Sequence, residues 1–325
     1  MKTIAFDVMG NDFGPQAAVQ ASLEFVQKNP DFQIILVGDK KEIEKFTKET
    51  SQIKILESPN IASSKDGLRQ VSKMENSMNS ALDLVVEKKA DAVLSSGDSG
   101  AYLTSALLKV KRLKGILRPA FMPIFPTIVK DKKILVLDVG ANLETKVEYL
   151  IQWTKLASIF SNKILKVKNP KCALVNIGVE DYKGFDFHKQ ANEELKQSNA
   201  NYIGFLEPRN ILDGKVDVAV VDGYGGNLIL KSMEGAVLAL KKVIKESITK
   251  TFFRKILALF LKKAFKDAAE RLDYRNVGAA WVLGLNGIVV KSHGSNDFKA
   301  YLGALEQVKQ GINAKVIDVF RETLE

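Results

Sequence analysis

Two glycine-rich loops carry the residues best suited to hold an anion. The first is "SSGDSGA" (95–101), which follows a short apolar run and precedes a stretch with helical spacing. Its backbone N–H groups, its two serine hydroxyls and the positive end of the following helix would together attract negative charge. The candidate anion-binding residues are Ser96, Gly97, Asp98, Ser99 and Gly100. A plainer alternative is that Ser99 only caps the helix.

The second loop is "VDGYGGN" (221–227), which again links an apolar run to a helical pattern. Gly223 and Gly226 allow a tight turn, and Asn227 opens the helix. Asp222 could bind a hydroxyl or amide of a substrate, or it could cap the helix through its carboxylate. Both interpretations stay open.

A third polar stretch, "KSHGSND" (291–297), holds one of the two histidines of the chain. His293 is flanked by small polar residues and could donate a proton or bind an anion. It could equally be a surface residue without a role. The other histidine, His188, is expected only to lie at the start of a helix.

Cofactor motifs are missing from the sequence. No GxGxxG follows the first apolar run, and neither GxxxxGK[ST] nor GxSxG occurs. One cysteine and two distant histidines do not make a zinc ligand set. We therefore expect no nucleotide, no metal and no other cofactor.

Short apolar runs alternate with helical spacing along the chain, which predicts a largely parallel sheet with helices on both faces. The runs lie at 3–6, 33–37, 92–94, 134–137, 173–175, 202–205 and 218–221, and the helical stretches at 17–27, 40–48, 77–88, 101–111, 146–160, 192–197 and 227–246. Five runs exit into Gly with Asp, Asn or Ser, at 7–15, 95–101, 137–142, 176–178 and 221–227. Ligands bind outside the carboxyl ends of parallel strands, so we expect these five loops on one edge.

The composition is that of an ordinary globular protein, with 46% hydrophobic and 26% charged residues in 325. No linker or repeat is visible, and residues 1–325 are interpreted as a single domain. Cys172 is the one cysteine, so no internal disulfide forms and a reducing compartment fits. No signal-peptide pattern is seen, and the longest charge-free run, 276–290, is shorter than the roughly 20 residues of a membrane span. A cytoplasmic protein is expected.

Most of the net charge of +10 comes from one segment. Residues 241–266 hold nine Lys or Arg and one acid, Glu246, which is +8, so the other 299 residues carry +2. This concentration argues against a general polyanion-binding surface, and nucleic acid is not expected as a partner.

Within that basic segment, "TFFRKILALFLKKAF" (251–265) has the pattern of an interfacial helix. Apolar side chains fall on one helical face and most Lys and Arg on the other. The predicted helical segment covers about 248–268, and its candidate membrane-contact residues are Phe252, Phe253, Ile256, Leu257, Phe260 and Leu261. The same apolar face could instead pack on a second subunit.

Seven motifs in register resemble the bacterial phosphate acyltransferase family called PlsX. They are "IAFDVMGNDFGP", "SSGDSGA", "RPA" (118–120), "LDVGAN", "NIGVEDYKG" (176–184), the stretch 201–235 and "GLNGIVVKSHGS" (284–295). The similarity runs from about residue 3 to 310.

The resemblance implies an enzyme that makes acyl phosphate from acyl-acyl carrier protein and inorganic phosphate. A membrane acyltransferase then moves the acyl group to glycerol 3-phosphate for phospholipid synthesis. It also implies a three-layer α/β/α fold like that of isocitrate and isopropylmalate dehydrogenases and phosphotransacetylases. A homodimer, peripheral attachment to an anionic membrane surface, and the absence of metal and nucleotide are implied as well. The basic helical face could then dock the acidic carrier protein.

Phosphate is largely dianionic near neutral pH and needs no catalytic triad to attack a thioester, so positioning and oxyanion stabilisation dominate. On this interpretation the loop at 96–100 holds phosphate. Asn142, Asn227 and His293 are the catalytic candidates, because each could touch the carbonyl or the departing sulfur. The remaining substrate-site candidates are Asp7, Asn11, Asp12, Lys183, Asp222, Gly223 and Gly226, of which Lys183 would add positive charge and the three aspartates would orient neighbours.

Three positions depart from the family pattern. Asp98 stands where the family has Asn, Asn11 where it has Gly, and Glu144 where it has Asp. A carboxylate facing phosphate would repel it. Asp98 therefore points away, is protonated or paired, or the loop is not the phosphate site.

Two other functions remain as alternatives. A coenzyme A-dependent phosphotransacylase would use the same chemistry, but its soluble short-chain product does not need the amphipathic segment. A non-catalytic lipid-binding scaffold would not need five polar loops around a cleft.

Overall fold

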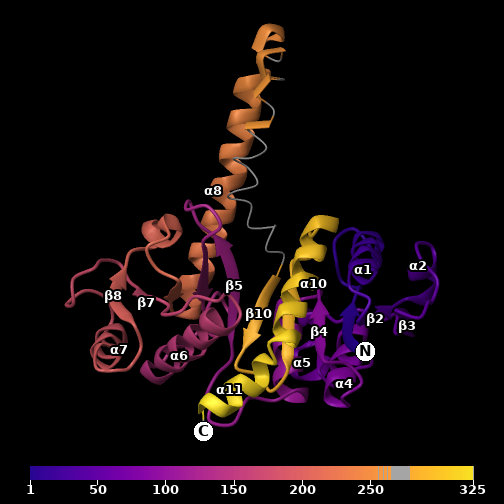
Figure 1. Ribbon diagram of the computed structural model, residues 1–325, viewed down its shortest axis with the longest axis horizontal. Helices are drawn as coiled ribbons and strands as arrows, with labels where there is room; N and C mark the ends of the chain where they lie inside the picture. Colours follow the sequence, from indigo (N-terminus) through magenta and orange to yellow (C-terminus); the bar gives the residue numbers. More distant parts are fainter. Residues whose placement is uncertain (255, 259, 262, 265–278, 325) are drawn as a thin grey trace.

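The chain folds around one mixed sheet of eleven strands, as a computed structural model shows (Figure 1). The structure describes residues 1–254, 256–258, 260–261, 263–264 and 279–324. The strand order is β3-β2-β1-β4-β11-β10-β5-β6-β9-β7-β8. The strands are β1 (Lys2–Asp7), β2 (Phe32–Gly38), β3 (Ile53–Glu57), β4 (Ala92–Ser95), β5 (Ala120–Pro126), β6 (Lys133–Leu137), β7 (Cys172–Val175), β8 (Tyr202–Leu206), β9 (Val218–Val220), β10 (Ala279–Leu283) and β11 (Ile288–Ser292).

The sheet has two parallel halves that run in opposite directions. Strands β3, β2, β1, β4 and β11 are mutually parallel, and so are β6, β9, β7 and β8. Between the halves, β11 pairs antiparallel with β10, β10 with β5 and β5 with β6. Because of these three antiparallel pairings, the strands of the second half run opposite to those of the first.

Helices cover both faces, so the architecture has three layers. One core lies under α1 (Gln16–Lys28), α2 (Lys40–Glu44), α6 (Val147–Lys163), α7 (Asp186–Lys196), α10 (Phe298–Asn313) and α11 (Val316–Leu324). The other lies under α3 (Leu68–Val71), α4 (Ser77–Val86), α5 (Ser99–Lys109) and the first turns of α8 (Gly223–Thr249). Strand residues alternate between the cores: Ile4 and Phe6 face the first, and Ala5 the second.

The predicted fold class is confirmed, and each predicted strand and helix overlaps an observed one. Strands β3, β5, β10 and β11 and helices α3, α10 and α11 were not predicted. Strand β5 carries two prolines, and β10 and β11 lie in one long apolar stretch whose turn is a weak signal. The expectation of five loops on one edge is wrong, because β1 and β4 run opposite to β6, β7 and β9.

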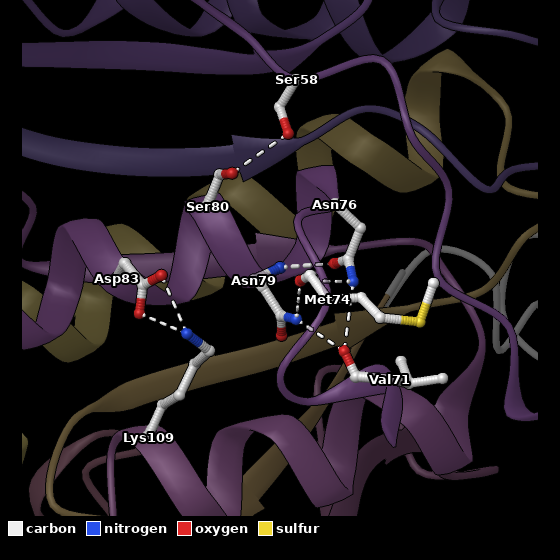
Figure 2. A network of polar contacts seen from close by, with 8 residues as sticks. All are labelled: Ser58, Val71, Met74, Asn76, Asn79, Ser80, Asp83 and Lys109. Atoms are coloured by element: carbon white, nitrogen blue, oxygen red, sulfur yellow. Dashed lines mark hydrogen bonds and ion pairs between the residues drawn. The ribbon is translucent and has the colours of Figure 1, made fainter. Parts of the chain in front are cut away.

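A polar clamp fixes the segment between β3 and α4 (Figure 2). Asn76 caps α4 by accepting from Asn79 N at 2.8 Å. The Asn79 amide donates to Val71 O and Met74 O, each at 2.7 Å. The clamp holds α3 and the preceding 3-10 turn, Ser64–Asp66, beside the start of α5. This turn is therefore held next to the loop at 96–100.

Helix α8 projects far out of the body (Figure 1). Its first turns pack on the sheet, whereas its distal turns expose apolar side chains, among them Val237, Leu240, Val243 and Ile244. Beyond it, the described residues between 252 and 264 are helical. Positions 255, 259, 262 and 265–268 of the predicted amphipathic segment lie outside the described residues. No helix in the described part of the chain is both long and apolar enough to cross a membrane.

Candidate active site

Three loops from the first half of the sheet meet at one rim. The loop after β1 touches the loop after β4 at Gly10, where a Cβ would lie 3.0 Å from the Gly97 Cα, and φ is +69°. Only glycine satisfies both conditions. Asp12 N donates to Gly294 O at 2.9 Å, which ties the loop after β1 to the loop after β11. Asn11 holds its own turn by donating to Val8 O at 2.8 Å.

The buried carboxylate of Asp7 holds this rim through hydrogen bonds. Its carboxylate accepts from Ser95 Oγ at 2.6 Å and from Met9 N at 3.1 Å, and Ser95 Oγ in turn accepts from Gly97 N at 3.2 Å. Burial raises the pKa of Asp7 to about 6, against the hydrogen bonds from Ser95 and Ser77, which lower it. Asp7 is therefore linked through Ser95 to Gly97 of the loop at 96–100.

Asp98 occupies the helix end that was expected to hold an anion. It is the N-cap of α5, accepting from Ala101 N at 2.9 Å and from Ser64 Oγ at 2.8 Å. Partial burial raises its pKa, but the hydrogen bonds from Ala101, Ser64 and Gly100 outweigh burial and hold the pKa below the usual range. Asp98 is therefore paired and ionised near neutral pH. It, and not Ser99, is the cap.

Lys291 supplies the buried positive charge, and sequence reasoning missed it. It lies on β11, is 8% exposed, and donates from Nζ to the carbonyl of Ser292. Burial lowers its pKa to about 8, while the Asp7 carboxylate acts in the opposite direction. The missed signal was a single charged residue inside the otherwise apolar run "IVVKS", just before His293.

His293 presents one ring nitrogen to its own loop. Its Nδ1 lies 3.2 Å from Ser295 N, which can only donate, so Nδ1 is the acceptor in this contact. The neutral ring then carries its proton on Nε2. Burial, followed by the charge of Lys291, lowers the pKa of His293 and favours this neutral form.

The loops of the second half are held by Asp138 at the end of β6. Its carboxylate accepts from the backbone N–H of Gly140, Ala141 and Asn142 and from the Asn142 amide at 2.9 Å. The Asn142 amide also donates to Pro119 O at 2.8 Å. Asn142 thus fastens its loop to β5.

The glycines of "VDGYGGN" bring α8 against this loop. A Cβ at Gly226 would lie 1.8 Å from Asp138 O, and one at Gly223 2.0 Å from Asn142 O. Asp222 caps α8 by accepting from Gly225 N at 2.7 Å, which confirms the capping interpretation, and His188 Nε2 is 3.7 Å from its carboxylate. His188 lies buried in the first turn of α7, the helix-start position that was predicted.

The two halves meet around a pocket of about 240 Å³. Of the predicted residues, Ser99, Asn227 and His293 line it. Lys231, Glu234 and Lys291 line it too and were not predicted. Ser96 is buried behind the rim, and Gly100 packs against Leu68. Lys183 is in the loop after β7, paired with Glu180 at 3.0 Å, and is not among the lining residues.

The pocket has both an apolar and a polar lining. The apolar lining is Phe121, Pro123, Ile124, Phe125, Val139, Leu230, Ala279 and Ala280. The polar and charged lining is Ser99, Asn227, Lys231, Glu234, Lys291, Ser292, His293, Ser295 and Asn296. The described residues contain no group of three or more His, Cys, Asp or Glu that could hold a metal ion.

Comparison with solved structures places the fold among the phosphotransacylases. A phosphotransacetylase from Streptococcus pyogenes superposes with a TM-score of 0.62 over 98% of this chain and 94% of its own, at 16% identity. At that identity the likeness concerns the fold.

Sequence comparison gives the family. The model of the family described as "Fatty acid synthesis protein" matches residues 2–319. Phosphate acyltransferases from Mycoplasma mobile and Mycoplasmopsis agalactiae are 54% and 51% identical to the chain, covering 100% of it and 100% and 98% of their own lengths. The chain belongs to this family of phosphate acyltransferases, as its motifs predicted.

The pKa of Asp7 gives a pH-dependent stability. A folded-state pKa of about 6, above the ordinary value, means that Asp7 destabilises the fold above pH 6 and that this penalty is relieved as the pH falls. From pH 7 to pH 5 we expect wild type to gain about 1 kcal/mol relative to Asp7→Asn. Urea unfolding of both proteins at the two pH values measures it. A constant difference between them would contradict the raised pKa.

Proposed function

We propose that the chain transfers the acyl group of an acyl-acyl carrier protein to inorganic phosphate and releases acyl phosphate for phosphatidic acid synthesis. One observation carries the proposal: Ser99, Lys291 and His293 line the same pocket as eight apolar residues. Family membership and the relatives' name support it.

The chemistry needs few groups. A phosphate oxygen attacks the thioester carbonyl, the C–S bond breaks, and the carrier thiolate leaves. Lys291 is the cation that neutralises phosphate, since Asp98 already takes part of the α5 N-terminus. His293 Nε2 donates to the developing oxyanion or to the departing sulfur. Asn227, exposed on the first turns of α8, is the second candidate donor.

We further propose that the chain works in the cytoplasm, attached peripherally to anionic membrane. Phe253 is 70% and Phe260 83% exposed, and Phe252, Ile256, Leu257 and Leu261 are exposed beside them. Six exposed apolar side chains at the end of a projecting arm, with basic residues around them, fit an interfacial anchor. A water-labile product then forms close to the membrane acyltransferase that uses it.

The exposed apolar residues on the distal turns of α8 support a homodimer. Val237, Leu240 and Ile244 recur at the three- and four-residue spacing of a helix–helix seam and are exposed in the single chain. A second copy would cover this face, whereas the segment from Phe252 onward would stay free for lipid.

Lys291→Met should abolish acyl transfer. Removing the cation that offsets phosphate should lower kcat/KM about a hundredfold or more, and Met nearly preserves the side-chain volume, so folding should persist. Incubation with palmitoyl-acyl carrier protein and phosphate, followed by thiol release and hydroxylamine trapping of acyl phosphate, measures it.

The control is Lys231→Met, which removes an exposed lysine paired with Glu234 at 2.9 Å and should cost less than tenfold. Equal losses in both variants would contradict the special role of Lys291. Product from palmitoyl-coenzyme A but not from the carrier-protein donor would assign the wild type to the coenzyme A reaction.

Asp98→Asn should strengthen phosphate binding. Asn keeps the helix cap but removes a negative charge near the nucleophile. We expect the KM for phosphate to fall about three- to tenfold at low ionic strength, and the gain to shrink with added salt. Asp66→Asn, on the neighbouring 3-10 turn, is the control and should leave the KM unchanged. An unchanged KM in Asp98→Asn would separate this loop from the phosphate site.

Phe253→Glu with Phe260→Glu should abolish binding to anionic liposomes and leave activity in solution intact, because two charges replace the exposed apolar contacts. Liposome co-sedimentation and the acyl phosphate assay test it. Val86→Glu with Leu108→Glu, two exposed apolar positions on the body, is the matched control. If the Phe253→Glu with Phe260→Glu protein instead dissociates into monomers in sedimentation analysis, the residues from Phe252 to Leu261 form a subunit interface.

A further inference from the structure

We propose that the apolar part of the pocket binds the carbonyl-proximal part of the acyl chain, and that Ala280 and Leu230 set the room for it. The proposal rests on the acyl-transfer function proposed above. It assigns a subsite and two specificity-determining residues.

The sheet places Ala280 directly beside Lys291. In the strand register Ala280 pairs with Lys291 on β11 and with Pro123 on β5. Residues that pair across strands point to the same face, with Cβ atoms about 5 Å apart. A row Lys291–Ala280–Pro123 therefore crosses the pocket floor. A chain whose carbonyl lies near Lys291 meets Ala280 first.

Small residues keep this floor open. Ala279 and Ala280 line the pocket, whereas the next residues of β10, Trp281, Val282 and Leu283, are large and buried. Phe121, Phe125 and Val139 line the same pocket, and Ala280 and Leu230 of α8 both pack against the apolar cluster that they belong to. A larger side chain at 280 would fill the space that the first methylenes need.

Phosphate alone gives no reason for such a lining. A dianion loses hydration in contact with apolar walls, whereas an alkyl chain gains roughly fourfold in binding for each methylene buried. The pocket volume of about 240 Å³ is many times the roughly 10–15 Å³ that one water molecule needs on the same measure. The pocket therefore has room for several carbons of a chain.

The test narrows the pocket from two sides. Ala280→Leu raises the floor, and Leu230→Trp thickens the α8 wall. Leu228→Trp is the matched control, because Leu228 is on the same helix, is 51% exposed and does not line the pocket. Each variant is assayed with carrier protein loaded with two-, eight- and sixteen-carbon acyl groups at varied phosphate.

Ala280→Leu and Leu230→Trp should lower kcat/KM for the eight- and sixteen-carbon donors about ten- to a hundredfold, from the loss of two to three buried methylenes. The two-carbon donor should lose clearly less than the longer donors, because its acyl group ends at the first carbon after the carbonyl. The KM for phosphate should change less than twofold, and Leu228→Trp should match wild type. Equal losses for all three donors, or an unchanged ratio between donors, would overturn the assignment.

A binding measurement separates this proposal from the proposed function. Octanoate is titrated into wild type and the three variants and followed by calorimetry. Weaker binding in Ala280→Leu and Leu230→Trp alone supports the chain subsite even if wild type makes no acyl phosphate. Equal binding in all four proteins overturns it even if wild type is active.

Discussion

The site depends on the pairing of β10 with β5. This pair joins two parallel half-sheets that run in opposite directions, and it does so in the middle of the molecule. Strand β5 pairs with β10 through Ala120–Pro123 and with β6 through Ile124–Pro126. The carboxyl ends of β11 and β6 therefore lie close to the same few residues of β5. Without the reversal, Lys291 and Gly140 would not line one pocket.

Two kinds of group compete for one helix terminus. The N-terminus of α5 can satisfy a bound anion or its own capping carboxylate, and Asp98 takes Ala101 N here. On the function proposed above, the charge that neutralises phosphate then comes from Lys291 on β11. Burial lowers the pKa of Lys291, and the Asp7 carboxylate counters that effect. Asp7 and Lys291 are coupled in this way across β4.

Local patterns were sufficient to predict most of the fold and the polar loops. Alternation of apolar runs with helical spacing revealed seven strands, and Gly with Asp, Asn or Ser marked the loops that line or support the pocket. What could not be predicted was the order and direction of the strands. The loop after β7 leaves the same edge as the loops after β6 and β9, but β7 lies beyond β9 in the sheet, and Lys183 does not line the pocket. Lys291 was missed because a single charge inside an apolar strand is a weaker signal than a glycine-rich polar loop.

Helix α8 sets a fixed length between the pocket and the exposed apolar segment from Phe252 onward. Leu230, in the first turns of α8, lines the pocket. The helix continues to Thr249, and the exposed apolar segment begins at Phe252. At 1.5 Å per residue, that distance is about 28 Å. An extended peptide gains about 3.3–3.6 Å over three bonds, so a sixteen-carbon chain of similar geometry spans about 18 Å. If only the exposed apolar segment enters the bilayer, a chain held at Lys291 cannot reach lipid. On the function and membrane attachment proposed above, the acyl phosphate then leaves the pocket before it enters the membrane, and the projecting helix shortens that transfer without making it continuous.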